Sequence, residues 1–191
     1  TISHNLTVSP EMMWVKSRLN GNRWTVFHKD IGPTKRCFID LNQAFDTGTV
    51  WNNTAPSSTV FSVGTDSNTN YSGHTFIAYL FASLAGVSKV GSYSGDGTTD
   101  GSKVIDCGFT SGARFIMIKT SNTVGDWMVY DTTRGIVVGN DPILLLNETY
   151  AEATTYDNLI PNSSGFAVIQ NTDGSYTTNE SGHSYIFYAI A

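Results

Sequence analysis

Two histidines are the first candidates for acid–base or metal chemistry in this sequence. His74 and His183 each follow a Ser-Gly pair and open an apolar run. A pair of histidines can serve as bases or as metal ligands. A turn that leads into a strand produces the same pattern, and in that case each imidazole caps its turn. We expect the structural role for both residues.

A glycine-rich loop supplies the next candidates. Asp96 and Asp100 lie in the run Ser-Gly-Asp-Gly-Thr-Thr-Asp-Gly, which is rich in oxygen ligands for calcium. The run lacks the order of acidic residues and the distant Glu of a calcium-binding loop, and ordinary turn chemistry accounts for the same residues. The sequence has no C-x-x-C pair, so no metal site is predicted. Cys37 and Cys107 either form a single disulfide or pack as two free, small apolar side chains.

No arrangement of residues predicts catalysis. The sequence contains no G-x-S-x-G, H-E-x-x-H or phosphate-binding loop. A pair of glycosidase carboxylates meets only in space, so spacing along the chain cannot identify one. Glu148, Glu152 and Asp157 lie in a polar segment and are interpreted as solvated. We expect a protein that is not an enzyme and that needs no cofactor.

Four aromatic residues are candidates for ligand binding. Each lies among Asn, Ser, Thr and Gly, and aromatic rings beside amides and hydroxyls can stack on sugars and hydrogen-bond to them. The alternative is that each ring covers the edge of its own core. The four candidates are Trp51, Tyr71, Tyr93 and Tyr176.

Composition limits the classes of partner. The chain has 191 residues, enough for one large β domain or for two small, nearly identical halves that share a core, and 40% of the residues are hydrophobic. Only 14% are charged, the net charge is −5, and no basic stripe occurs, so nucleic acid is not an expected partner. No apolar stretch approaches the roughly 18 residues of a membrane span, so membrane insertion is not expected.

An internal repeat organises the elements that must position these residues. Residues 12–16 align with 115–119 at an offset of 103, and the match continues without a gap for about twenty residues. After a two-residue slip, Leu41-Asn42 aligns with Leu146-Asn147. We assign residues 6–82 to copy one and 109–191 to copy two, joined by a bridge at 83–108. The repeat pairs are Lys16 and Lys119, Trp24 and Trp127, Gly32 and Gly135, and His74 and His183.

The segments predict an all-β fold. Short apolar runs rich in β-branched and aromatic residues are bounded by Gly, Asn, Asp, Ser or Thr, as in strands. Residues 75–82 and 184–191 are apolar at nearly every position, which predicts two central strands. The bridge predicts a hairpin with a long loop, and 147–157 can hold one helical turn. We expect a single domain, an antiparallel β-sandwich of jelly-roll type whose pseudo-symmetric copies bury Trp24 and Trp127 at equivalent places.

Seven segments carry a family resemblance: residues 87–97, 108–109, 115–119, 126–131, 133–135, 164–166 and 181–191. Together they resemble a domain of unknown function seen in tail-fibre-like and other virion proteins of marine and cyanobacterial phages. Copy one matches more weakly, through Trp14-Val15-Lys16, Trp24, Asp66-Ser67-Asn68 and Gly73. The resemblance implies a virion appendage, commonly trimeric, and brings no catalytic residues with it.

The resemblance favours a phage structural protein on the surface of the virion. Its expected role is that of a tail-fibre or appendage domain that binds a receptor. Its expected partners are other copies of itself, other virion proteins and a host-surface glycan. A capsid decoration or head-fibre protein is the alternative within that class. A carbohydrate-binding module of a secreted enzyme and a hydrolase with an unrecognised site are alternatives of other classes. Symmetric assembly favours the virion protein, whereas sugar binding by a monomer favours the module.

Overall fold

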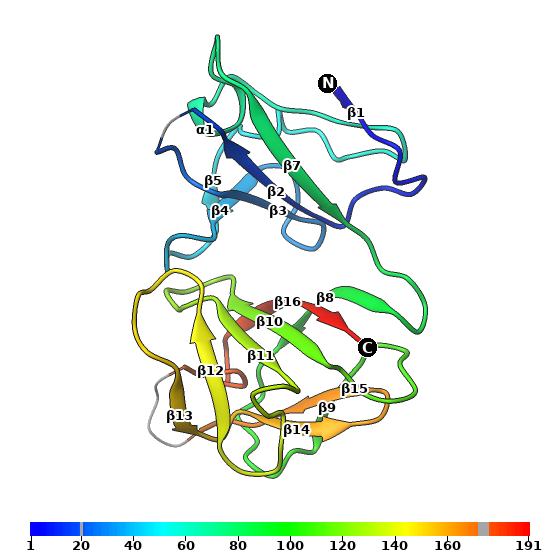
Figure 1. The fold of residues 1–191 in the computed structure, drawn as a ribbon, viewed down its shortest axis with the longest axis vertical. Coiled ribbons are helices and arrows are strands. Elements are labelled where there is room, and N and C mark those ends of the chain that lie inside the picture. The colour runs from blue at the N-terminus through cyan, green and yellow to red at the C-terminus, as the bar shows by residue number, and fades with distance from the viewer. Residues whose placement is uncertain (20, 172–175) are drawn as a thin grey trace. The chain divides into compact units, whose positions relative to one another are not determined.

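The chain forms two compact units. The computed structural model describes residues 1–19, 21–171 and 176–191. Contacts within the chain separate Thr1–Ala82, here unit 1, from Ser83–Ala191, unit 2. Each unit has two antiparallel sheets, so the predicted all-β sandwich class is confirmed (Figure 1). Whether the two units form a single domain depends on how they are joined, so the single domain stays a prediction.

Unit 2 has a large and a small sheet. The large sheet has the order β13-β12-β11-β10-β16-β8, in which β10 to β13 run as a meander, and the small sheet has the order β14-β15-β9. The large sheet contains β8 (Ser88–Ser94), β10 (Phe115–Thr120), β11 (Met128–Asp131), β12 (Asp141–Leu145), β13 (Ala153–Tyr156) and β16 (Ser184–Ile190). The small sheet contains β9 (Lys103–Asp106), β14 (Leu159–Asn162) and β15 (Gly165–Val168).

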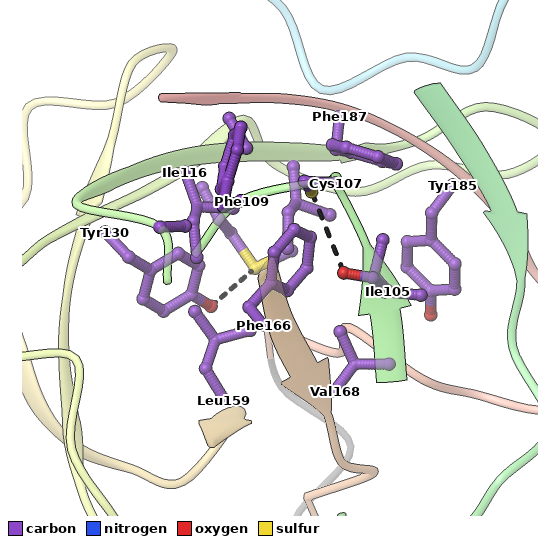
Figure 2. Close-up of a cluster of buried hydrophobic side chains, with 14 of the residues drawn as sticks. Ile105, Cys107, Phe109, Ile116, Tyr130, Leu159, Phe166, Val168, Tyr185 and Phe187 are labelled. Atoms are coloured by element: carbon purple, nitrogen blue, oxygen red, sulfur yellow. Dashed lines mark hydrogen bonds between the residues drawn. The ribbon is translucent and has the colours of Figure 1, made fainter. Parts of the chain in front are cut away.

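The core of unit 2 lies between these two sheets. Figure 2 shows Phe166 and Val168 of β15 among side chains of the large sheet. The ring centroids of Phe166 and Phe187 lie 5.4 Å apart and nearly perpendicular, a favourable edge arrangement. The buried Tyr130 hydroxyl donates to Met128 Sδ at 3.5 Å, so this phenol carries its polar group into the core with a partner.

Unit 1 repeats this plan on a smaller scale. Its large sheet has the order β5-β4-β3-β2-β7, and β1 pairs with β6 in the second sheet. Asp66 caps the four-residue α1 by accepting from Asn68 N at 2.8 Å. Among the described residues, no helix is long and apolar enough to cross a membrane. The elements are β1 (Ile2–Ser3), β2 (Met12–Ser17), β3 (Thr25–His28), β4 (Lys35–Phe38), β5 (Asp46–Thr47), β6 (Val60–Phe61), α1 (Ser67–Asn70) and β7 (Phe76–Phe81).

The two large sheets share strand order and register. Met12 of β2 lies opposite His28 of β3 and Phe81 of β7. At the offset of 103, Phe115 of β10 lies opposite Asp131 of β11 and Ile190 of β16. The order β5-β4-β3-β2-β7 therefore corresponds to β13-β12-β11-β10-β16. The repeat seen in the sequence is a repeat of hydrogen-bonded ladders.

Backbone pairing also corrects the limits of the copies. Ile2 pairs with Phe61 in unit 1, and Ile105 pairs with Phe166 in unit 2. Because Ile2 and Ile105 are again 103 positions apart, β1 corresponds to β9, and the copies begin earlier than residues 6 and 109. The whole bridge, residues 83–108, lies in unit 2, and its strand β8 has no counterpart among the described strands of unit 1.

A side-chain contact corrects the alignment in the middle of the repeat. The backbone N–H of Trp24 donates to Asp40 Oδ1 at 3.0 Å, and that of Trp127 donates to Asn147 Oδ1 at 2.8 Å. Asp40 therefore corresponds to Asn147, so the match of Leu41-Asn42 with Leu146-Asn147 was wrong by two residues. The sequence match followed residue type, whereas the structure follows the group that accepts from the tryptophan amide.

The bridge does not form the hairpin that its turn predicted. Its two strands are present, but β8 pairs with β16 and β9 pairs with β15 in the other sheet. The added β8 makes β16 a central strand, as expected for residues 184–191. The same expectation for residues 75–82 was wrong, because within unit 1 β7 pairs only with β2 and lies at the edge of the described sheet.

The helical turn expected within residues 147–157 is also absent. Residues 153–156 form β13, which pairs with β12. Thr154 and Thr155 favour a strand over a helix because their branched Cβ atoms crowd a helical turn. The unpredicted β14 contains Pro161, which is compatible with a strand at the edge of a three-stranded sheet.

The repeated tryptophans are not equally buried. Trp127 is 1% exposed, as predicted. Trp24 is only half-buried and stacks on Tyr79 at a centroid distance of 6.2 Å. Tyr79 is itself 43% exposed, so it shields the Trp24 indole from solvent only in part.

Replacing the two tryptophans should have unequal effects. Trp127→Ala should lower the free energy of unfolding of unit 2 by about 3–5 kcal/mol, because it leaves a cavity in packed surroundings. Trp24→Ala should cost less, since part of the indole already contacts water. Urea denaturation, monitored by hydrogen exchange within each unit, measures both changes in the free energy of unfolding. Equal losses would contradict the difference in burial.

A glycine in β8 should not tolerate a side chain. A Cβ on Gly91 would lie 2.6 Å from the Phe187 ring, whereas one on Gly21 would meet nothing within 4 Å. Gly91→Ala should therefore destabilise unit 2 by about 1–3 kcal/mol through displacement of the ring. Gly21→Ala is the control and should be near neutral. Thermal unfolding checks both, and a neutral Gly91→Ala would show that the ring moves freely.

Candidate functional site

A pocket in unit 2 is a candidate site for a polar ligand. It has a volume of about 270 Å³. Its walls combine hydroxyl and amide side chains with one tyrosine and one carboxyl group, the groups that hydrogen-bond to sugars and stack on them. The pocket is lined by Thr99, Asn140, Thr155, Tyr156, Asp157, Ile169, Gln170 and Asn171.

Asp157 is the most informative wall residue. Its Oδ1 is buried and has no hydrogen-bond partner among the described residues. Burial raises the pKa of this carboxyl above its ordinary value. A buried acceptor without a donor is rare in folded proteins. Because Asp157 also lines the pocket, its carboxyl group is the candidate contact for a hydroxyl or amide group of a ligand.

Tyrosines extend the site from the pocket along the surface. The rings of Tyr156 and Tyr176 meet edge to face at a centroid distance of 4.9 Å. Tyr176 has a φ of 51°, an uncommon conformation for a residue other than glycine. Burial, followed by the proximity of Tyr156, Asp126 and Tyr150, raises the pKa of the Tyr176 phenol. Tyr150 is 70% exposed, so its ring presents aromatic surface to solvent.

A buried network holds the pocket in place. Asp141 accepts backbone hydrogen bonds from Val137, Asn158 and Leu159 at 3.2, 3.1 and 2.8 Å. Asn158 Nδ2 donates to the Tyr130 hydroxyl at 3.1 Å, and Asn171 Nδ2 donates to Asn158 Oδ1 at 2.9 Å. These hydrogen bonds join Asn158, which follows Asp157 in the chain, and the wall residue Asn171 to the core.

The four aromatic candidates separate into different environments. Tyr176 lies beside the pocket. Trp51 is fully buried in the core of unit 1, where its ring meets Phe27 at 5.8 Å, so it is not available to a ligand. Tyr93 stacks on the core residue Tyr185 at 5.0 Å and donates its hydroxyl to Thr178 O at 2.7 Å. Tyr71 is 52% exposed in unit 1.

Sequence reasoning missed most of the pocket. Asp157 was interpreted as a solvated loop residue, yet its Oδ1 is buried at the end of β13. Tyr156, Gln170 and Asn171 were not candidates at all. The run Thr155-Tyr156-Asp157-Asn158 places an aromatic ring among polar groups, and this was the signal available in the sequence.

The repeated histidines make equivalent contacts within their own units. His74 N donates to Tyr71 O and His183 N donates to Glu180 O, both at 3.1 Å. His74 Nδ1 also lies 3.3 Å from Ser17 Oγ. These contacts join each histidine to the turn before the last strand of its copy and favour the structural interpretation.

The acidic loop residues bind their own backbone. Asp96 accepts from Thr98 N at 3.0 Å and from Thr98 Oγ1 at 2.8 Å, and these bonds lower the pKa of its carboxyl. Asp100 accepts from Ser102 N at 2.9 Å, and its bonds to Ser102 lower its pKa as well. Both are turn-capping contacts. Within the described ranges, no three His, Cys, Asp or Glu residues gather as metal ligands.

Other repeat positions have structural roles. Gly32 and Gly135 have φ angles of 88° and 134°, and their N–H groups donate to His28 O and Asp131 O. Lys119 is fully buried, whereas Lys16 donates to Ser17 O at 3.0 Å. The structure also decides whether the two cysteines form a disulfide. Cys37 and Cys107 are buried and form no disulfide, and burial raises the pKa of the Cys107 thiol to about 12.

The Asp141 network should make unit 2 less stable as pH rises. Burial, which outweighs three accepted hydrogen bonds, raises the pKa of Asp141 to about 6. The folded state then binds this proton more tightly than the unfolded chain, whose Asp has a pKa of about 3.9. The contribution to stability is present below about pH 4 and is lost as pH rises through 6.

Asp141→Asn should remove this loss. Between pH 4 and pH 7, the free energy of unfolding of the native chain should fall by about 2–3 kcal/mol relative to the variant. At pH 4 the variant should be less stable than the native chain, because its amide nitrogen faces the Val137 N–H. Urea denaturation across this range measures the two profiles. Parallel profiles would show that Asp141 does not titrate in this interval.

Comparison with known proteins gives a family without a described activity. No curated protein and no solved structure matches the chain. A family model described as a domain of unknown function, DUF7483, matches residues 1–191, so one model spans both units. The chain therefore belongs to the DUF7483 family.

Proposed function

We propose that this chain is a non-catalytic virion protein, a tail-fibre or appendage domain that binds a receptor on the particle surface. The observation that carries the binding role is the pocket beside β13. There, Asp157 lines a space together with hydroxyls, amides and Tyr156, and its buried Oδ1 has no hydrogen-bond partner among the described residues. These groups suit a polyhydroxylated ligand such as a surface glycan.

The use of polar side chains supports a binding role over catalysis. Four carboxylates of the chain are engaged with backbone amides. Asp96 and Asp100 cap turns, and Asp66 caps α1. Asp141 holds three amides inside the core. Such contacts stabilise loops. A carboxylate whose oxygens accept from backbone amides is poorly placed to exchange protons with a substrate.

The virion location rests on the resemblance of residues 87–191 to domains of phage appendage proteins. The expected state is a homotrimer, because such appendages commonly adopt closed symmetry. The low charged fraction of 14% supports assembly, since few ions must lose water when surfaces pack together.

A glycan array probed with the full chain tests the binding role. Asp157→Asn keeps the size of the side chain but turns one acceptor oxygen into a donor, so it should weaken sugar binding at least about tenfold, or about 1.4 kcal/mol. Gln170→Ala should also weaken it. Tyr71→Ala is the matched control, since Tyr71 is the exposed aromatic candidate of unit 1. Loss with Tyr71→Ala alone would move the site to unit 1.

Mass measurement of the purified chain tests the assembly. Light scattering after size exclusion should give three times the chain mass of 20.7 kDa at micromolar concentration. A strictly monomeric chain that still binds sugar through Asp157 would favour the second candidate, a carbohydrate-binding module of a secreted enzyme. The same pocket supports that candidate, and only the assembly separates the two.

A further inference from the structure

The outer edge of β7 differs from that of its counterpart in unit 2. Arg18 N donates to Thr75 O at 2.9 Å, so alternation along the ladder directs the N–H and C=O groups of Phe76, Ala78 and Leu80 away from β2. Among the described residues of unit 1, no strand pairs along that side. The segment Phe-Ile-Ala-Tyr-Leu-Phe carries no charge, and an uncharged edge strand is open to pairing.

In unit 2 the equivalent edge is occupied by β8. Ala191 N donates to Val87 O at 2.9 Å and Gly95 N donates to His183 O at 2.8 Å, one at each end of the ladder. Between these bonds, Phe187 lies opposite Gly91 and Tyr185 lies opposite Tyr93. At the offset of 109 that relates β7 to β16, Ala78 corresponds to Phe187. Unit 2 therefore shows the kind of strand that this edge accepts.

A pocket lies beside the open edge within unit 1. It has a volume of about 310 Å³, and its apolar wall includes Ile2, Val15, Phe61, Phe76 and Ala78. Ala78 is exposed, whereas Phe187 is 4% exposed and packs its ring against Phe166, the counterpart of Phe61. Alanine in place of phenylalanine thus accounts for the empty space.

Complementarity across the β8 ladder indicates what fills that space. In unit 2 the large side chain is on β16, and the residue opposite must be small, because a Cβ on Gly91 would lie 2.6 Å from the Phe187 ring. In unit 1 the small side chain is on β7. A strand that pairs with β7 therefore needs a large apolar residue opposite Ala78, where directly opposed side chains share a face.

We propose that the β7 edge is a docking site for an extended strand of a partner polypeptide chain. The strand runs antiparallel to β7 in the register that β8 has on β16. Its backbone completes the ladder at Phe76, Ala78 and Leu80, and a bulky apolar side chain enters the pocket opposite Ala78. Backbone pairing supplies affinity, and the pocket supplies selectivity. The site is separate from the pocket beside β13 and does not depend on the sugar-binding proposal.

Two synthetic peptides test the site on the full chain. One has the sequence of residues 87–95, and the other carries Gly91→Phe. Fluorescence polarisation should show saturable binding of both, with the Phe peptide at least about tenfold tighter. The Ala78→Phe variant fills the pocket as Phe187 does and should reverse this preference. Absence of saturable binding by both peptides, or the same preference on Ala78→Phe, would overturn the proposal.

Matched controls make each result decisive. Ile77→Phe adds a ring on the opposite face of β7 and should leave the peptide preference unchanged. Tyr93→Pro in the Phe peptide removes a ladder donor and should abolish its binding. Hydrogen exchange should show new protection in residues 76–81, and protection confined to β16 would contradict the site. Ala78→Leu fills the pocket with less strain and serves if Ala78→Phe fails to fold.

Self-association is the remaining outcome. If the chain dimerises and the Phe peptide dissociates the dimer, the edge is used by a second copy, and the partner strand is ruled out. A chain whose mass is unaffected by the peptide, together with the reversed preference on Ala78→Phe, supports the proposal.

Discussion

Backbone hydrogen bonding along β2 and β10 fixes the register of each large sheet and thereby determines which side chains face the core of each unit. Each of these strands is paired on both sides, β2 with β3 and β7 and β10 with β11 and β16. In an antiparallel ladder, a shift of one residue would turn every core side chain toward the opposite face. The shared register therefore places Met13 and Val15 in one core and Ile116 and Ile118 in the other.

The two copies have diverged mainly where the ladder ends. In unit 2, β8 extends the large sheet, and the inward residues Tyr185, Phe187 and Ala189 are all buried. In unit 1, Ala78 takes the position of Phe187, and the second sheet is reduced to β1 and β6. At this position the same plan thus produces packed side chains in unit 2 and an apolar pocket in unit 1.

Polar side chains in this protein act chiefly on the backbone. The protein has few charged residues, so many of its loops are held by Asx turns and amide contacts, as at Asp96, Asp100 and Asn147. The pocket beside β13 stands apart because Asp157 Oδ1 has no such partner among the described residues. Hydrogen bonds of Asn158 connect the walls of this pocket to the core of unit 2, so the position of the pocket depends on the core packing.

The sequence by itself determined the class of fold and the repeat. Strand propensity and the offset of 103 are local properties, so β2 and β10, and β3 and β11, follow from residue order alone. Tertiary structure decided which strands are neighbours: β8 joins β16 and leaves β9 to the small sheet, and β7 lies at an edge. It also decided that Trp51 is buried whereas Asp157 lines a pocket. Pairing and burial depend on residues distant in the chain, and two apolar runs of similar composition become a central strand or an edge strand according to what lies beside them.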